Sequence, residues 1–344
     1  MLDIGALRER LHAAGARPVH EERVLRQWSR AEPQANGRQR PEDFLPLALR
    51  AALPALEAEL RALAVLRADH ASADGSRRLL VGLADGRSVE SVLLPRGGLC
   101  VSSQVGCAVA CVFCMTGLGG LERQLGSAEI VAQVALARSL RPVSKVVFMG
   151  MGEPAHNLDA VLESIDLLGT GGGIGHKQLV LSTVGDRRVF ERLPGGRVKP
   201  ALALSLHSTD AALRARLLPH APAIGPDELV ARGDAYANST GYPLQVQWTL
   251  LCGINDTTDE IDGLVRLLAG KRAVLNLIPY NTVEGLAFAR PAAERSLAIA
   301  RELQRRGILT KLRQSAGQDV EAGCGQLRAR HQGGDKRRIA IVAA

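Results

Sequence analysis

Apolar positions in the first part of the chain recur at helical spacing. Up to about residue 67, and most clearly over Leu53–Leu66, apolar residues return every three or four positions, which predicts helices. Pro54 is expected to interrupt these helices, as is an earlier proline at position 41. Two β-rich runs follow, Arg78–Leu83 and Ser88–Leu94, and the turn sequence Ala-Asp-Gly-Arg between them predicts a β-hairpin.

From residue 99 the pattern changes to short apolar runs that alternate with longer amphipathic segments. The short runs predict strands at Leu99–Ser103, Lys145–Met149, Gln178–Ser182, Ala201–Leu206, Leu244–Leu250 and Ala273–Ile278, with a last one at Ile308–Leu312. The longer segments predict helices at Ser127–Leu140, Leu158–Leu168, Pro226–Asn238, Thr258–Leu268 and Ala292–Arg306. Strands that alternate with helices form a parallel sheet. Six such units favour an α/β fold with a partial (β/α)6 barrel, and a doubly wound open sheet is the alternative.

The chain therefore divides into four predicted regions. Residues 1–75 form an N-terminal helical accessory region, 76–98 a β-hairpin linker, 99–327 the partial barrel with a C-terminal loop, and 328–344 a basic tail. The accessory region either contacts RNA or caps the barrel, and the cations of the tail either neutralise phosphates or are simply solvated. In both candidate architectures ligands bind at the carboxyl ends of the strands, so site residues are expected directly after strands.

Composition and charge narrow the class of protein. A hydrophobic fraction of 46% with 23% charged residues is typical of a globular protein, and no apolar run is long enough to span a membrane. The first residues lack the apolar core of a signal peptide, so we expect a cytoplasmic protein. The net charge of +8 indicates a nucleic-acid partner, although a bias toward arginine, which replaces lysine almost throughout, explains it equally well. Aromatic residues make up only 3%, which argues against a broad base-stacking platform.

Three of the six cysteines lie within eight residues, at Cys107, Cys111 and Cys114, in the loop after the first predicted barrel strand. Three thiolates can hold three irons of a [4Fe–4S] cluster and leave the fourth iron open, whereas electron-transfer ferredoxins use four cysteines. The alternative is a zinc site completed by His207 or His176. Iron–sulfur is favoured because structural zinc sites usually combine paired C-x2-C elements.

A C-x3-C-x2-C motif in this position resembles the signature of the radical S-adenosylmethionine (SAM) superfamily. Further segments occur in the order found in the RlmN/Cfr family of RNA adenosine C-methyltransferases, which the chain resembles from about Glu90 to Leu327. They are Leu99–Cys107, Phe148–Pro154, Leu181–Thr183, Ser205–His207, Asn276–Asn281 and Gly317–Leu327. Ordered segments at compatible intervals are more specific than the cluster motif alone.

The resemblance implies the cofactors and their ligands. A [4Fe–4S] cluster is held by the three clustered cysteines, and SAM binds its open iron. SAM is contacted by Gly152, Glu153, Ser182, Ser205, Leu206, His207 and Asn281, with Thr183 as an alternative to Ser182. Reduction of the cluster by an external electron donor cleaves SAM to a 5′-deoxyadenosyl radical.

The resemblance also implies a thiol that carries the methyl group. Cys324, in a glycine-rich loop, corresponds to the family's S-methylcysteine, and Cys100 to the thiol that resolves the protein–RNA adduct through a transient Cys100–Cys324 disulfide. Glu90 corresponds to the proton acceptor. Cys252 has no counterpart.

The expected function is methylation of an adenine ring carbon of RNA by a monomeric protein with no membrane partner. C2 is favoured over C8 as the commoner activity in the family, and 23S rRNA, then tRNA, are the expected substrates. Two alternatives remain open at this point. One is a radical SAM reaction with C8 or with another substrate, and the other is a non-catalytic iron–sulfur or zinc protein that binds RNA.

Overall fold

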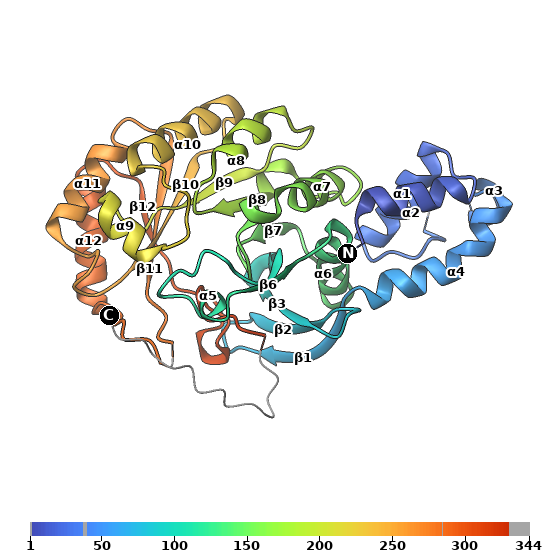
Figure 1. The fold of residues 1–344 in the computed structure, drawn as a ribbon, viewed down its shortest axis with the longest axis horizontal. Coiled ribbons are helices and arrows are strands. Elements are labelled where there is room, and N and C mark those ends of the chain that lie inside the picture. The colour runs from blue at the N-terminus through green and yellow to red at the C-terminus, as the bar shows by residue number, and fades with distance from the viewer. Residues whose placement is uncertain (1, 37–39, 284, 330–344) are drawn as a thin grey trace.

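The computed structural model describes residues 2–36, 40–283 and 285–329. Its N-terminal helices, which project from one side of the molecule in Figure 1, are α1 Ile4–Ala13, α2 Pro18–Ser29, α3 Pro41–Phe44 and α4 Leu47–Ala62. The prediction that Pro54 interrupts a helix was wrong, because α4 runs through it. A buried stripe of leucines, Leu49, Leu53, Leu56 and Leu60, holds both halves of α4 in one line.

The central sheet has ten strands in the order β1-β2-β3-β4-β7-β8-β9-β10-β11-β12 within the described residues. Neighbours from β1 to β4 are antiparallel, and neighbours from β4 through β12 are parallel. The strands are β1 Val65–Ala71, β2 Arg77–Gly82, β3 Ser88–Leu94, β4 Gly98–Val101, β7 Lys145–Phe148, β8 Leu179–Thr183, β9 Ala201–Ser205, β10 Leu244–Leu250, β11 Ala273–Pro279 and β12 Thr310–Leu312. The predicted hairpin is β2–β3, and the predicted barrel strands are confirmed to within a few residues at their ends.

One strand corrects the predicted boundaries. Residues 65–71, which we assigned to the helical accessory region, form β1 and extend the hairpin into a three-stranded meander. None of the β1 residues is buried, so the strand has no apolar signature of its own. Its conformation is imposed by pairing with β2, whose residues are almost all buried.

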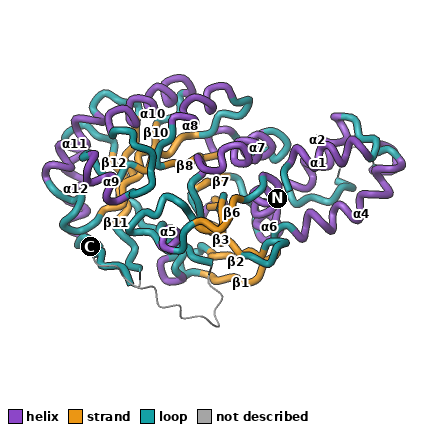
Figure 2. The backbone as a smooth tube through the Cα atoms, viewed as in Figure 1, coloured by secondary structure: helices purple, strands orange, loops and turns teal. Residues whose placement is uncertain are grey.

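The parallel strands are arranged as a partial barrel and not as a doubly wound sheet. Strand order follows chain order from β4 to β12 without the reversal that a doubly wound sheet requires. The connecting helices lie on the outside of the curved sheet (Figures 1 and 2). They are α6 Ser127–Leu140, α7 Leu158–Gly169, α8 Arg187–Arg192, α10 Pro226–Thr240, α11 Thr258–Leu268 and α12 Ala293–Arg305. The short helix α9 Ala211–Leu217 instead packs at the mouth of the barrel, where the amide of Val112 donates to the Leu217 carbonyl.

The N-terminal helices pack on α6 and α7. The amide of Ile4 donates to the Ser127 hydroxyl at 2.8 Å, and Arg138 of α6 donates to the Ser29 carbonyl at 2.7 Å. Because the sheet covers one side of α6 and α2 covers another, α6 is buried over most of its surface, which explains its apolar sequence.

A small structure at the mouth of the barrel escaped prediction. It consists of β5 Gln104–Gly106 paired with β6 Leu121–Gln124, with the one-turn helix α5 Met115–Leu118 between them. Gly106 has φ = 79°, and a Cβ atom there would lie 2.0 Å from the carbonyl oxygen of Gly120, so only glycine fits. This close approach fixes both ends of the cysteine loop.

Among the described residues, no helix combines the length and the apolar character needed to cross a bilayer.

Candidate active site

The carboxyl ends of the barrel strands converge on a cavity of about 220 Å³. Ten of the predicted site residues line it: Cys100, Cys107, Cys111, Cys114, Gly152, Glu153, Ser182, Ser205, His207 and Cys324. They come from β4, the cysteine loop, the loops after β7, β8 and β9, and the C-terminal loop, which are far apart in sequence. The expectation that site residues follow strands is therefore met. Glu90, Leu206 and Asn281 do not line the cavity.

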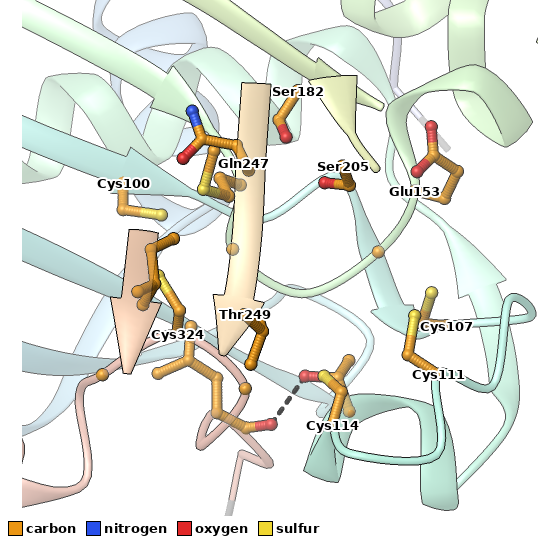
Figure 3. Close-up of a pocket in the computed structure, with 18 of the residues that line it drawn as sticks. Cys100, Cys107, Cys111, Cys114, Glu153, Ser182, Ser205, Gln247, Thr249 and Cys324 are labelled. Carbon is orange, nitrogen blue, oxygen red and sulfur yellow. Dashed lines mark hydrogen bonds between the residues drawn. The ribbon is translucent and has the colours of Figure 1, made fainter. Parts of the chain in front are cut away.

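The cysteine loop is held in shape by backbone contacts at both ends. The amide of Cys107 donates to the carbonyl of Gly120 at 2.9 Å, and the amide of Cys114 donates to the carbonyl of Cys111 at 3.0 Å. Ala110, between the first two cysteines, has φ = 53°, which tightens the turn. As a result the sulfurs of Cys107 and Cys111 point to the same side in Figure 3.

Burial raises the pKa of the Cys107 thiol to about 12 and raises that of Cys111 well above its usual value, and in both cases the neighbouring Cys114 thiol adds to the effect. Glu153 faces the same two thiols, and burial raises the pKa of its carboxyl as well. Four acidic groups thus border one cavity. Such a set favours a cationic occupant, which would lower all of these pKa values together.

The cysteine loop fits a cluster better than a single zinc ion. At a Zn–S distance of about 2.3 Å, tetrahedral geometry places ligand sulfurs only about 3.8 Å apart. Among the described residues, no three His, Cys, Asp or Glu side chains lie close enough to hold one metal ion. A cubane accepts a wider spacing, because each cysteine binds a different iron. His176 cannot complete a zinc site, since it precedes β8 at the opposite end of the barrel, where its Nδ1 accepts from the Lys199 amide.

The loop after β7 offers a carboxylate with a free acceptor position. Glu153 accepts from the amides of Ala155 and Val184, at 3.0 Å each, through different oxygens. The Thr183 side chain also hydrogen-bonds to this carboxylate, which leaves one of its four acceptor positions for an ammonium group. Gly152 has φ = 106°, and a Cβ atom there would lie 2.7 Å from the Gln104 side chain. Only glycine therefore allows the backbone to pass this close to Gln104.

His207 after β9 is a neutral side chain with a fixed tautomer. Its Nδ1 accepts from the Thr249 amide at 2.9 Å, which places the proton on Nε2. Burial, assisted by the buried guanidinium of Arg214, lowers its pKa to about 3. The ring meets Phe113 of the cysteine loop edge-on at 5.1 Å, and the backbone has φ = 62°. The imidazole can therefore act as a hydrogen-bond donor at neutral pH.

Leu206 and Asn281 lie behind the cavity wall. Leu206 is fully buried, and only its backbone is engaged, through its amide to Gln247 and its carbonyl to Arg214. The Asn281 amide nitrogen donates to the Cys324 carbonyl at 3.0 Å and to the Ser315 hydroxyl at 2.8 Å. Its buried Oδ1 has no hydrogen-bond partner among the described residues. Because Asn281 does not line the cavity, this orphaned acceptor would meet a ligand donor only if the C-terminal loop that it holds moved.

Two further thiols face the cavity, at Cys100 on β4 and Cys324 on the C-terminal loop. Figure 3 shows them on the side of the cavity away from Cys107 and Cys111. Burial and the nearby Cys324 thiol raise the pKa of Cys100 to about 12. Cys324 is exposed at the edge of the cavity, where desolvation by the surrounding protein and the nearby Cys114 thiol raise its pKa as well. Cys324 therefore lies between Cys100 and the cysteine loop, and both thiols are protonated at neutral pH.

The C-terminal loop is docked on the cysteine loop. The amide of Met115 donates to the Gly325 carbonyl at 2.8 Å, and the hydroxyl of Thr116 donates to the Leu327 carbonyl at 2.7 Å. Gly325 has φ = 85°, which favours glycine.

The structure places Glu90 outside the cavity, contrary to what the sequence led us to expect. This fully buried residue on β3 forms an ion pair with Arg78 on β2, and its other oxygen accepts from the amides of Arg328 and Ala329 at 2.7 and 3.1 Å. In this arrangement the carboxylate fastens the chain that follows Cys324. Of the predicted basic tail, only Arg328 and one further residue are described, and the cations at 330, 336, 337 and 338 lie outside the described residues.

Sequence reasoning missed two polar residues of β10 that line the cavity. Gln247 lies opposite Ser205 in the β9–β10 register, and Thr249 follows two positions later on the same face. Polar residues at alternate positions of an otherwise apolar strand were the available signal. It was missed because we expected site residues directly after strands, whereas these two lie within β10.

Comparisons with known proteins agree with the site. The sequence model of the radical SAM superfamily matches residues 101–268. A probable RNA methyltransferase of Methylibium petroleiphilum is 72% identical over 331 residues, which cover 96% of this chain and 94% of that protein. One of Azoarcus sp. is 69% identical over 97% of this chain and 96% of its own length. A crystal structure of a radical SAM methyltransferase from Sphaerobacter thermophilus superposes with a TM-score of 0.82 at 33% identity and covers 96% of this chain and 98% of that one.

Proposed function

Because the chain belongs to the radical SAM family that these probable RNA methyltransferases represent, we propose that it methylates an adenine ring carbon of RNA through an S-methylcysteine. C2 is the proposed target carbon, and 23S rRNA is the first candidate substrate, followed by tRNA. One observation carries the proposal: two thiols, Cys100 and Cys324, line the same cavity as the three-cysteine loop. An RNA-binding protein without catalytic activity has no use for such a pair.

The proposed roles begin with cofactor binding. Cys107, Cys111 and Cys114 hold the [4Fe–4S] cluster of the family, and Glu153 accepts a hydrogen bond from the ammonium group of SAM. When bound, the two cofactors supply a carbon-centred radical. Radical chemistry can methylate an adenine ring carbon, which is too weak a nucleophile for polar methyl transfer. His207, neutral and with its proton on Nε2, and Ser205 beside it are positioned as hydrogen-bond partners for SAM.

Cys324 is the proposed methyl carrier, and Cys100 releases the product. Attack of the Cys100 thiolate on the Cys324 sulfur forms a disulfide and breaks the bond between that sulfur and the carbon attached to RNA. The electron pair of the broken bond stays on the carbon, which takes up a proton and remains on the base as a methyl group. An external thiol must then reduce the Cys100–Cys324 disulfide before the next turnover.

Glu90 remains the proposed acceptor of the ring proton, under one condition. Its carboxylate is occupied by Arg78 and by the amides of Arg328 and Ala329. To take a proton from the substrate, it must lose the contacts to these two amides, which happens when the chain after Cys324 moves outward. Release of the carrier loop and exposure of the base are then one event.

The test uses protein reconstituted anaerobically with iron and sulfide, SAM and a 23S rRNA transcript. The expected results are a methyl group on Cys324, found by peptide mass spectrometry, and methyladenosine in the digested RNA, with the target carbon read from the nucleoside standard. Cys324→Ala should abolish methyl transfer and leave the cluster absorbance unchanged. The matched control is Cys252→Ala, because Cys252 is an exposed thiol away from the cavity. Continued methylation by Cys324→Ala would exclude the carrier mechanism.

A further inference from the structure

The lysines of this chain are concentrated at one end of the barrel. Only six of its 43 cationic residues are lysine. Five of these lie at or directly before the N-terminal ends of β7, β8, β9, β11 and β12, and we call this set the lysine rim: Lys145, Lys177, Lys199, Lys271 and Lys311. The sixth, Lys336, is outside the described residues. Every lysine that the structure describes thus lies at a single location, in a chain that otherwise uses arginine.

Members of the lysine rim are close to one another. Lys145 and Lys177 border a cavity of about 210 Å³, together with Gln178, Tyr242 and Gln245. Lys311 on β12 and Arg313 directly after that strand act electrostatically on Lys145: burial and these two cations lower the pKa of Lys145. The Lys199 amide donates to His176, the residue before Lys177, at 3.4 Å.

Acidic residues are missing where these cations gather. The six segments that lead into β7 to β12, residues 141–145, 170–178, 194–200, 241–244, 269–272 and 306–311, contain no Asp or Glu. Several acids of the adjoining helices are paired with arginines or with Lys271, as in Arg197–Asp166, Arg306–Asp262 and Lys271–Asp234. Within the described part of the chain, Lys145, Lys177, Lys199 and Lys311 have no acid within ion-pair distance, and all but the half-buried Lys145 are exposed.

The lysine rim is at the opposite end of the barrel from the reaction cavity. Along β10, Gln245 borders the rim cavity, whereas Gln247 and Thr249 line the reaction cavity. Between the two cavities, the side chains of Val180, Ala201 and Ala203 pack together inside the barrel. Strands of five to seven residues at about 3.3 Å per residue separate the two ends by roughly 15–20 Å, so a molecule that touches both must pass around the helices.

We propose that the lysine rim binds the phosphate backbone of RNA at a second surface, remote from the nucleotide in the reaction cavity. The inference rests on the proposed function in that the partner is the RNA substrate. Exposed ammonium groups without acidic partners release counterions when they meet phosphates, which gives affinity without sequence preference. A substrate that occupies both surfaces is a large folded RNA, whereas a short stem-loop reaches the cavity alone.

The experiment compares the holoenzyme with a triple variant, Lys177→Ala, Lys199→Ala and Lys311→Ala, in filter binding to an unmodified 23S rRNA transcript. We expect binding at 0.1 M salt to weaken by about 10- to 100-fold, and the salt slope to fall by about 2, since each lost phosphate contact removes about 0.7–0.9 from it. Lysine-to-arginine exchange at the same positions should preserve binding. The control variant replaces Arg187, Arg192 and Arg266 by alanine, which changes the net charge equally on the helix surface.

Methylation kinetics give the second measurement. For the triple alanine variant, KM for the 23S transcript should rise, whereas kcat/KM for the shortest methylated fragment should stay unchanged. Unaltered transcript binding in that variant, or an equal loss in the helix-surface control, overturns the inference and leaves the proposed function intact. If the triple alanine variant binds RNA normally and loses activity only when an acidic flavoprotein replaces dithionite as reductant, the inference is overturned and the rim is a surface that binds the electron donor. If no RNA is methylated but the rim variant still loses binding, the proposed function fails and the inference stands.

Discussion

Replacing Arg78 by methionine removes the charge that faces Glu90 inside the β2–β3 hairpin. The two side chains are 9% and 0% exposed, so water cannot take the place of the guanidinium. A buried charge that loses its partner destabilises a protein by about 3–5 kcal/mol. Because the amides of Arg328 and Ala329 still donate to Glu90, we expect the lower end of this range, about 3 kcal/mol.

A second change separates charge from packing. In the double variant Arg78→Met with Glu90→Gln, no buried charge remains, and the carboxamide oxygen still accepts from the amides of the C-terminal segment. The free energy of unfolding of the double variant should be within about 1 kcal/mol of that of the parent protein, since a buried ion pair and a neutral pair of similar size often stabilise a protein equally. Activity should nevertheless stay lost, because glutamine cannot accept the ring proton.

The assays are urea unfolding of the apoprotein and hydrogen exchange at the amides of Arg328 and Ala329. Arg78→Met alone should accelerate exchange at both amides, and the double variant should restore their protection. A cost below about 1 kcal/mol for Arg78→Met would refute the argument, as would a double variant no more stable than the single one. Recovery of activity along with stability would exclude Glu90 as the base.

Three other predictions follow from the site. Cys100→Ala should trap a covalent protein–RNA adduct on denaturing gels. In the parent protein the rate of adduct resolution should rise about tenfold per pH unit from pH 7 to 9, because the thiolate is the nucleophile and the pKa of Cys100 is raised to about 12. A rate that does not change with pH would contradict this. SAM affinity, measured by calorimetry on the reconstituted protein, should show no His207 titration between pH 5 and 8, because the pKa of His207 is lowered to about 3 and the ring stays neutral; a midpoint near 6.5 would be evidence against a buried ring. Gly106→Ala should strongly reduce the iron content after reconstitution, since its Cβ would meet the Gly120 carbonyl at 2.0 Å, whereas Gly119→Ala, which meets nothing within 4 Å, should load normally.

The barrel could be predicted because each strand carries its own signal. β8 is buried at every position and β10 at most of them, and turn residues bound both. β1 carries no such signal, because its residues alternate between exposed and half-exposed and it becomes a strand only by pairing with β2. β5 and β6 depend on the contact between Gly106 and Gly120, which no local pattern encodes.

Part of the site could likewise be predicted from the sequence, and part could not. The cysteine loop is contiguous in sequence, and the resemblance to a family supplied Cys100 and Cys324, which line the same cavity. The surroundings of Glu90 could not be predicted, since the amide that it accepts from belongs to Arg328, 238 residues away. Side-chain polarity alone does not show which tertiary partner a buried charge will find.

The docking of residues 325–327 on α5 has a consequence for how the enzyme is matured. The hydrogen bonds from Met115 to Gly325 and from Thr116 to Leu327 close the chain over the pocket that must receive four irons and four sulfides. Insertion therefore has to occur before these hydrogen bonds form or while they are open, so the segment that must move outward during the proposed reaction also controls when the protein can be loaded.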